Sequence, residues 1–233
     1  MEIAQFKYGT DNLGYLVYTT SRGIAIDGGD PAAIIAFAQE KGIEIIGVTN
    51  THSHGDHTPG NAGLMEQTGA VFLDCGSFTQ GQGIELGEGQ GLEVLLTPGH
   101  TMDSVCFKGE GFVVTGDTLF NGTVGNCFSG DLTAFYRSLK QLIQLPDDTL
   151  IYAGHDYVME SLQYARIIEP ENPDIVRYKE GYNPDKIVSC LADELEVNPY
   201  LRFNAPAMIL RLEEKNLPAD TELQRFTSIM EIY

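Results

Sequence analysis

Thr51-His52-Ser53-His54-Gly55-Asp56-His57 is the stretch of sequence that decides the fold and the chemistry of this chain. It directly follows IEIIGVTN (residues 43–50), a nearly continuous apolar run of the kind that forms a strand buried on both faces. Residues 51–61 are too polar for a strand, so we expect a loop there. Imidazole and carboxylate groups gathered in one loop are typical ligands of Zn²⁺, Fe or Mn²⁺. The stretch therefore predicts a metal site at the end of a buried strand.

The remaining histidines also lie at the ends of predicted strands. His100 ends the segment LEVLLTPGH, His155 lies near the end of DTLIYAGHD, and Asp117 ends FVVTGD. A lone histidine is most often a core or surface residue, but all 5 histidines of this chain fall at predicted strand ends. The candidate metal ligands are His52, His54, Asp56, His57, His100, Asp117 and His155.

These donors are too numerous for a single metal ion. One ion takes three or four protein ligands, so the set predicts two ions that share a bridging carboxylate. Asp117 is the expected bridge, because an ionised carboxylate at the end of a buried strand is costly unless metal ions or hydrogen bonds compensate its charge. We expect two divalent ions, with Zn²⁺ ahead of Fe and Mn²⁺.

The rest of the chain predicts a layered α/β domain with a smaller helical unit. Short alternating runs predict strands within residues 2–30, and Asp30-Pro31 predicts a helix that ends at Gly42. The Gly-rich residues 76–91 are expected to be turns and loop. Further strands are expected at 70–75, 92–100, 104–109, 112–117 and 148–156, and helices at 64–69, 131–143 and 157–169. Beyond about residue 165 the strand signals stop, and residues 187–197 and 206–216 predict helices.

Composition narrows the possible partners and the compartment. The formal net charge is −19, and so acidic a surface repels phosphate backbones and anionic lipids, which excludes nucleic acid and membrane partners. The N-terminus has no basic region leading into an apolar one, so no secretory signal is expected. The 4 cysteines form no C-x-x-C pair, so we expect free thiols and a cytoplasmic protein.

Five sequence blocks carry a resemblance to a known family. The T-H-x-H-x-D-H pattern of residues 51–57 is the metal-binding signature of the metallo-β-lactamase superfamily, and the chain resembles its glyoxalase II group (hydroxyacylglutathione hydrolases) along nearly its whole length. TPGHT (97–101), TGDTLF (115–120) and GHDY (154–157) are similar to blocks found across the superfamily. ARIIEPENP (165–173) and NPYLR (198–202) are similar to blocks more particular to glyoxalase II.

This resemblance implies a fold and a reaction. The fold is an αββα sandwich, residues 1–165, with a C-terminal helical region, residues 166–233, that contributes to the substrate pocket. His52, His54 and His100 would hold the first ion, Asp56, His57 and His155 the second, and Asp117 would bridge them. The implied enzyme is a metal-dependent hydrolase in which a hydroxide held by both ions attacks a thioester, with Asp56 as the catalytic residue that orients it. The sequence has no G-x-S-x-G motif that would offer a side-chain nucleophile instead.

The substrate side departs from the glyoxalase II pattern. In that group, a basic residue and a tyrosine in the loop after the G-D-T-L-F block hold glutathione. When the loops are aligned on Gly125 and Gly130, Asn126 and Phe128 stand at these two positions, and the loss of a cation removes a charge-assisted contact. Tyr157 matches the group's other substrate tyrosine. The candidate substrate contacts are Tyr157, Asn126 and Phe128, and the substrate is a small acyl-thiol whose thiol need not be glutathione.

Alternative functions share this signature. A sulfur dioxygenase with one iron has a similar fold and favours an H-D-Y sequence like that of residues 155–157, although residues 169–173 and 198–202 fit glyoxalase II better. A lactonase or β-lactamase-like hydrolase would use the same metal site. A metal-binding protein without activity would be expected to have lost ligands, and none of the predicted set is missing. An RNA-processing nuclease would need a basic run that this sequence lacks.

Overall fold

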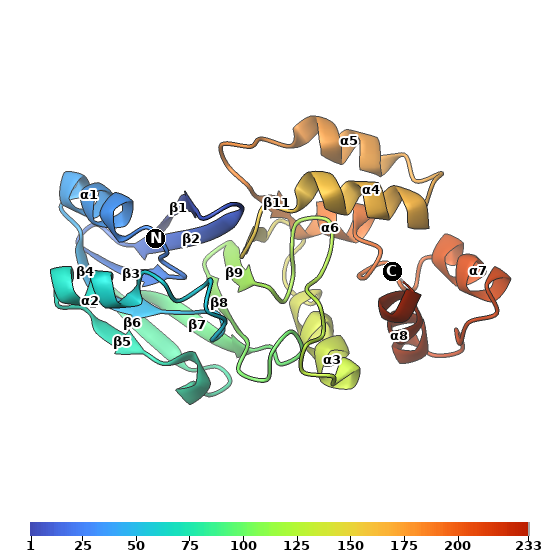
Figure 1. Cartoon of the computed structure of the whole chain (residues 1–233), viewed down its shortest axis with the longest axis horizontal. Coiled ribbons are helices and arrows are strands. Elements are labelled where there is room, and N and C mark those ends of the chain that lie inside the picture. The colour runs from blue at the N-terminus through green and yellow to red at the C-terminus, as the bar shows by residue number, and fades with distance from the viewer. Residues whose placement is uncertain (233) are drawn as a thin grey trace.

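Two β-sheets face each other between layers of helices in the computed structural model, which describes residues 1–232 (Figure 1). The strand order is β1-β2-β3-β4-β5 in the first sheet and β11-β10-β9-β8-β7-β6 in the second. The first sheet consists of β1 (Glu2–Tyr8), β2 (Asn12–Tyr18), β3 (Arg22–Ile26), β4 (Glu44–Thr49) and β5 (Val71–Leu73). The second consists of β6 (Gly83–Gly87), β7 (Gln90–Leu96), β8 (Val105–Gly109), β9 (Phe112–Gly116), β10 (Leu150–Ala153) and β11 (Ser189–Cys190). The predicted αββα fold class is confirmed.

Helices cover the outer face of each sheet. α1 (Pro31–Lys41) and α2 (Asn61–Thr68) pack on β4 of the first sheet, and α3 (Leu132–Leu142) packs with α8 (Glu222–Ile232) on the other side of the molecule (Figure 1). The remaining helices are α4 (Val158–Ile168), α5 (Asp174–Gly181), α6 (Leu191–Val197) and α7 (Pro206–Glu214), and a short 3-10 turn, η1, spans Cys75–Ser77. Within residues 1–232, no helix combines the length and apolar character needed to cross a membrane.

The alternation of side chains along β2 explains the layers. All seven residues of β2 are buried, because each face of the strand meets another layer. Leu13, Tyr15 and Val17 point into the core between the two sheets, whereas Leu16 and Tyr18 belong to the core beneath α1 and α2. A third core lies between the second sheet, α3 and the C-terminal helices. The sandwich is thus held by apolar contacts on both faces of its sheets.

Two helices begin where aspartates predict them. The Asp30 carboxylate accepts a hydrogen bond from Ala33 N at 3.0 Å, and the Asp131 carboxylate accepts one from Ala134 N at 2.8 Å. Each satisfies an amide that would otherwise lack a partner in the first helical turn. These caps fix the starts of α1 and α3 as the sequence predicts.

Two predicted segments are corrected by the structure. Residues 76–91 are expected to be turns and loop, but Gly83–Gly87 forms β6. Ile84 and Leu86 are buried on one face of this strand, and Glu85 lies on the other face. Helix was expected from residue 187, but Ser189 and Cys190 pair with β10 and the helix begins at Leu191. Ser189 and Cys190 pair with the distant β10, which overrides their helical pattern, whereas β6 pairs with the neighbouring β7 in a hairpin.

A buried carboxylate ties the C-terminal helices to the second sheet. Glu194 of α6 is fully buried, and its oxygens accept hydrogen bonds from Gly122 N at 2.8 Å, Tyr178 OH at 2.6 Å and Ser189 Oγ at 2.6 Å. Burial raises the pKa of Glu194, although these hydrogen bonds act in the opposite direction. Gly122 lies in the loop that follows Asp117, so the helical region helps to fix that loop.

Candidate metal centre

The loops after four strands bring the seven predicted metal ligands together. Residues 51–57 follow β4, His100 lies in the turn after β7, Asp117 directly follows β9, and His155 follows β10. Donor atoms of these residues form three clusters, namely His52/His54/His100, His52/His57/Asp117 and Asp56/His57/His155, and within each the atoms lie within 4.8 Å of one another. The proximity of the seven residues agrees with the prediction. Their role as metal ligands remains a prediction.

His52, His54 and His100, here called the first group, face one another through ring nitrogens. His52 Nε2 lies 2.9 Å from His54 Nδ1, and His100 Nε2 lies 3.1 Å from the same atom. A tetrahedral zinc ion with bonds of about 2.0–2.1 Å would hold its ligand atoms about 3.3–3.4 Å apart. Three ring nitrogens that converge at nearly this spacing could hold a metal ion.

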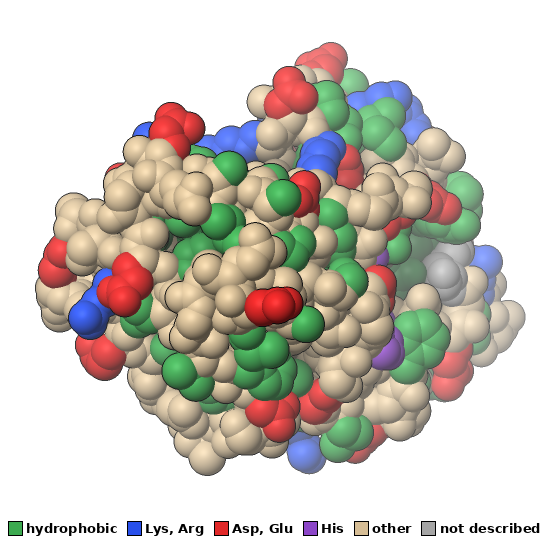
Figure 2. All heavy atoms as spheres, turned by 60° about the vertical axis from the view of Figure 1, so that its left-hand side comes forward, with side chains coloured by type: hydrophobic (Ala, Val, Ile, Leu, Met, Phe, Trp, Pro, Cys, Tyr) green, Lys and Arg blue, Asp and Glu red, His purple; other side chains and the backbone are tan. Residues whose placement is uncertain are grey.

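Asp56, His57 and His155, here called the second group, have the same kind of spacing. His155 Nε2 lies 3.2 Å from His57 Nε2 and 3.3 Å from Asp56 Oδ2, and His57 Nε2 lies 3.6 Å from that oxygen. Asp56 is half exposed, whereas both rings are buried. The second group therefore lies at the surface end of the site. In Figure 2, histidine side chains are visible in a recess of the surface, beside hydrophobic side chains.

Asp117 lies between the two groups. Its Oδ1 is 3.4 Å from His57 Nε2, and its Oδ2 is 3.5 Å from both His100 Nε2 and His155 Nε2. Asp117 is 7% exposed, and its buried Oδ1 has no hydrogen-bond partner in the part of the chain that the structure describes. A buried carboxylate oxygen without a partner is costly. This oxygen and the converging ring nitrogens show that the residues present fit a pair of bound metal ions.

The far side of the His57 ring is held by a carboxylate that sequence reasoning missed. Asp27 is fully buried and accepts hydrogen bonds from His57 Nδ1 at 3.1 Å, Thr51 N at 2.8 Å and Thr51 Oγ1 at 2.7 Å. Such a partner fixes the tautomer and the orientation of a metal-binding imidazole. The signal was present in the sequence, because Asp27 ends the apolar run GIAI just as Asp117 ends FVVTG.

Two further rings are fixed in the same way. His100 Nδ1 lies 2.9 Å from the main-chain oxygen of Asn126, and His155 Nδ1 lies 2.7 Å from Asp11 Oδ1. In both cases the outer nitrogen is hydrogen-bonded, which leaves Nε2 with a free lone pair directed into the site. Asn126 was predicted as a substrate contact, and its main-chain oxygen has this second role that the sequence did not reveal.

Burial lowers the pKa of two rings of the site, whereas neighbouring carboxylates raise the pKa of His57 and His155. Burial, strengthened by the charge of His57, lowers the pKa of His52 to about 4 despite nearby carboxylates, and burial likewise lowers that of His100. Burial alone would lower the pKa of His57, but Asp27 and Asp117 raise it to about 11. Burial would raise the pKa of Asp117, but the neighbouring imidazoles of His155 and His57 hold it far below its ordinary value. Asp117 is therefore ionised at neutral pH.

Aromatic side chains flank both groups. Phe128 is 66% exposed, and its ring centroid lies 5.2 Å from that of His100 and 5.7 Å from that of His54. Tyr157 stacks on His155 with ring centroids 4.9 Å apart and an interplanar angle of 5°. Both predicted aromatic contacts thus border the metal donors, one beside each group, and any contact with a substrate remains a prediction.

Asp27→Asn is expected to weaken metal binding about 10–100-fold, the usual effect of losing a partner behind a ligand. One of the two carboxylate oxygens becomes an amide that cannot accept the His57 proton, so Nδ1 loses an acceptor and the tautomer with a proton on Nε2 is favoured. Competition with a chromophoric chelator for Zn²⁺ measures the effect. Asp30→Asn is the matched control, since Asn caps a helix as well as Asp. Equal affinities in the two variants would contradict the assigned role.

Comparisons with known proteins agree with this geometry. The profile of the metallo-beta-lactamase superfamily matches residues 12–73 and 71–155, and that of the hydroxyacylglutathione hydrolase C-terminus matches residues 156–231. The chain is 38% identical over 226 residues to a hydroxyacylglutathione hydrolase of Polaromonas sp., covering 87% of this chain and 86% of the relative. It is 35% identical over 226 residues to one from Nitrosococcus oceani, with the same coverage of 87% and 86%.

A solved structure shares the whole fold. The crystal structure of ETHE1 from Myxococcus xanthus superposes with a TM-score of 0.72 at 25% sequence identity, covering 100% of this chain and 91% of that one. The similarity therefore includes the C-terminal helices as well as the sandwich.

Proposed function

Because this chain belongs to the metallo-beta-lactamase superfamily and to the hydroxyacylglutathione hydrolase group within it, we propose that it is a metal-dependent hydrolase of thioesters. The observation that carries the proposal is the position of Asp117 between two groups of donors, with a buried oxygen that has no hydrogen-bond partner within residues 1–232. We propose that the first group, the second group and Asp117 hold two ions, and that these ions are zinc, which suits imidazole and carboxylate ligands.

The chemistry that a pair of ions supplies at such a site is activation of water at neutral pH and polarisation of the carbonyl group to be attacked. The chain's own contribution begins with Asp56. Burial would raise the pKa of Asp56, but a hydrogen bond from Asn12 and the charge of His57 lower it, so the carboxylate is ionised. Half exposed and 3.3 Å from His155 Nε2, Asp56 is placed to orient the attacking water and to accept its proton.

Tyr157 places a hydroxyl beside the predicted metal donors. Burial and the carboxylates of Asp11, Asp117 and Asp56 raise its pKa to about 12, so its hydroxyl keeps its proton at neutral pH and can donate a hydrogen bond to the substrate. On the opposite side of the donors, the exposed ring of Phe128 offers an apolar surface. Asn126 lacks the charge and Phe128 lacks the hydroxyl of the glyoxalase II residues that hold glutathione, so the proposed substrate is an acyl-thiol whose thiol need not be glutathione. We also propose that residues 166–233 contribute to its pocket and that the enzyme works in the cytoplasm.

The proposal is tested by release of free thiol from a panel of thioesters, with S-D-lactoylglutathione beside thioesters of uncharged thiols. The expected result is chelator-sensitive hydrolysis of at least one member, with the uncharged thiols preferred. Hydrolysis of lactones or β-lactams without any thioester hydrolysis would support a metal-dependent hydrolase. It would overturn the assigned substrate class.

Asn126→Arg is expected to lower the KM for S-D-lactoylglutathione by about tenfold, because a charge-assisted hydrogen bond to a carboxylate contributes about 1.5–3 kcal/mol. Steady-state kinetics of thiol release measure this change. Gln39→Arg, which adds the same charge on the exposed side of α1, is the control for the overall charge of the protein. A KM that changes equally in both variants, or not at all, would count against Asn126 as a substrate contact.

A further inference from the structure

The turn between β1 and β2, here called the hairpin tip (residues 8–12), lies directly on the second group. Its backbone is paired on both sides of His155: Leu13 N donates to Gly154 O at 2.8 Å, and Asp156 N donates to Asp11 O at 2.9 Å. Asn12 and His155 form an isolated antiparallel bridge between these bonds. The tip therefore has a fixed position relative to the loop that carries His155.

Three groups of the hairpin tip contact the second group. Asn12 Nδ2 donates to Asp56 Oδ2 at 3.0 Å, and Asp11 Oδ1 lies 2.7 Å from His155 Nδ1. The Tyr8 hydroxyl donates to the main-chain oxygen of Asp56 at 2.9 Å. Asn12 is 8% exposed, so its amide is directed into the site and not into solvent. Asp56 is half exposed on a loop, and it depends on these bonds for its orientation.

The first group depends on other elements. His52 Nδ1 lies 3.1 Å from Thr51 Oγ1, within the loop after β4. His100 Nδ1 lies 2.9 Å from the main-chain oxygen of Asn126, in the loop after β9. The hairpin tip thus contacts Asp56 and His155, whereas these contacts of the first group come from the loops after β4 and β9, with Asp117 between the two groups.

We propose that Asn12 and Asp11 are positioning residues for the second group, so that the hairpin tip sets the affinity of one metal subsite and leaves the other unchanged. This inference rests on the proposed function only in assuming that both groups bind metal. Loss of the Asn12 amide frees the Asp56 carboxylate to turn toward solvent, and loss of the Asp11 carboxylate frees the His155 ring to rotate. Removal of either partner lowers the metal affinity of the second group without removing a ligand.

The test is a titration of metal-free protein with Zn²⁺ by calorimetry, with metal counted per chain after desalting. Wild type is compared with Asn12→Ala and with Asn12→Leu, which keeps the side-chain volume if the smaller residue impairs folding. Thr10→Ala is the control, because Thr10 is exposed in the same turn. In both Asn12 variants we expect one binding step as in wild type and one weakened about 10–100-fold, the usual effect of losing such a partner.

The variant His54→Ala shows which binding step belongs to which group of donors. This variant loses a first-group donor, so its remaining step belongs to the second group, and adding Asn12→Leu should weaken that step by the same factor as in the single variant. Equal weakening of both steps in Asn12→Leu, or no change in either, would overturn the inference. If wild type itself took up no Zn²⁺, the proposed function would fail instead, so the two failures are distinguishable.

Discussion

Asp117→Asn is expected to lose metal and activity together, with kcat reduced about a thousandfold or more, since metal ions supply several kcal/mol of stabilisation to such reactions. The carboxylate lies 3.4–3.5 Å from ring nitrogens of both groups. An amide in its place has no charge and a single acceptor oxygen, so it cannot serve both groups. Metal content per chain and the rate of thiol release, measured on the same preparation, check this expectation.

Asp74→Asn is the matched control for Asp117→Asn, because Asp74 caps the short helical turn at Cys75–Ser77 and an asparagine serves equally well there. That variant should keep wild-type metal content and rate. Full metal occupancy in Asp117→Asn would show that Asp117 is not the bridge between the two groups.

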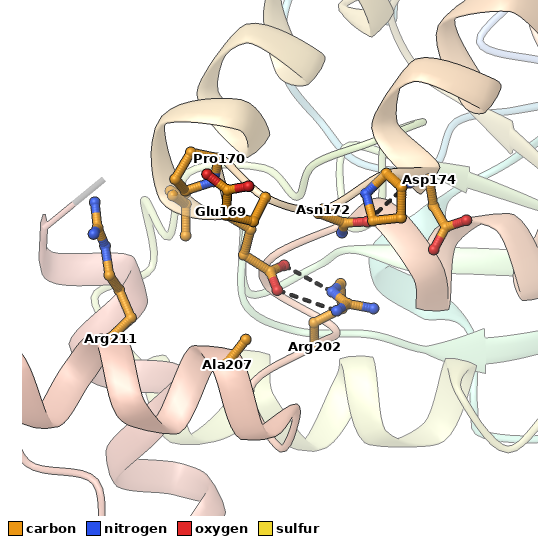
Figure 3. A pocket seen from close by; sticks show the side chains of 10 residues that line it. Glu169, Pro170, Asn172, Asp174, Arg202, Ala207 and Arg211 are labelled. Carbon is orange, nitrogen blue, oxygen red and sulfur yellow. Dashed lines mark hydrogen bonds and ion pairs between the residues drawn. The ribbon is translucent and has the colours of Figure 1, made fainter.

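Arg202→Met is expected to lower the free energy of unfolding by about 3–5 kcal/mol, a large share of the stability of an ordinary domain. Arg202 Nε and Nη2 donate to the two oxygens of Glu169 at 2.7 Å and 3.1 Å, in a cavity of about 410 Å³ between the ends of α4 and α7 (Figure 3). The Glu169 side chain is 5% exposed. Without Arg202 its charge would be buried and unpaired, at the junction between the sandwich and the last helices.

Urea unfolding measures this loss, and two further variants isolate its cause. Arg177→Met removes an arginine whose side chain is 59% exposed and paired with Asp174 and Glu196, and each such exposed pair contributes at most about 1 kcal/mol. Glu169→Gln combined with Arg202→Met removes the buried charge and should recover part of the stability. Equal losses in Arg202→Met and Arg177→Met would contradict a buried, paired role for Glu169.

Much of the fold could be predicted because its signals are local. Asp30 and Asp131 cap helices through amides only three residues away, and β4 lies within the nearly continuous apolar run of residues 43–50. The candidate metal donors could be named, and their proximity predicted, because every histidine follows an apolar run. Each of these features depends on neighbours in the sequence.

What could not be predicted depends on distant partners. β11 is a segment of only two residues that pairs with the distant β10, so its own residues carry little signal. Asp11 and Asn12 lie in an ordinary polar turn, and they acquire their role only because the fold carries that turn to His155, 143 residues from Asn12. The supports behind a metal site therefore require the structure, whereas the donors themselves do not.

The most direct test of the account is the number of metal ions per chain in protein purified without added metal chelator or metal salt. We expect two ions per chain, held by the first group, the second group and Asp117 between them. One iron per chain would contradict it, because the second group would then have no ion to hold and the dioxygenase alternative would explain the site better.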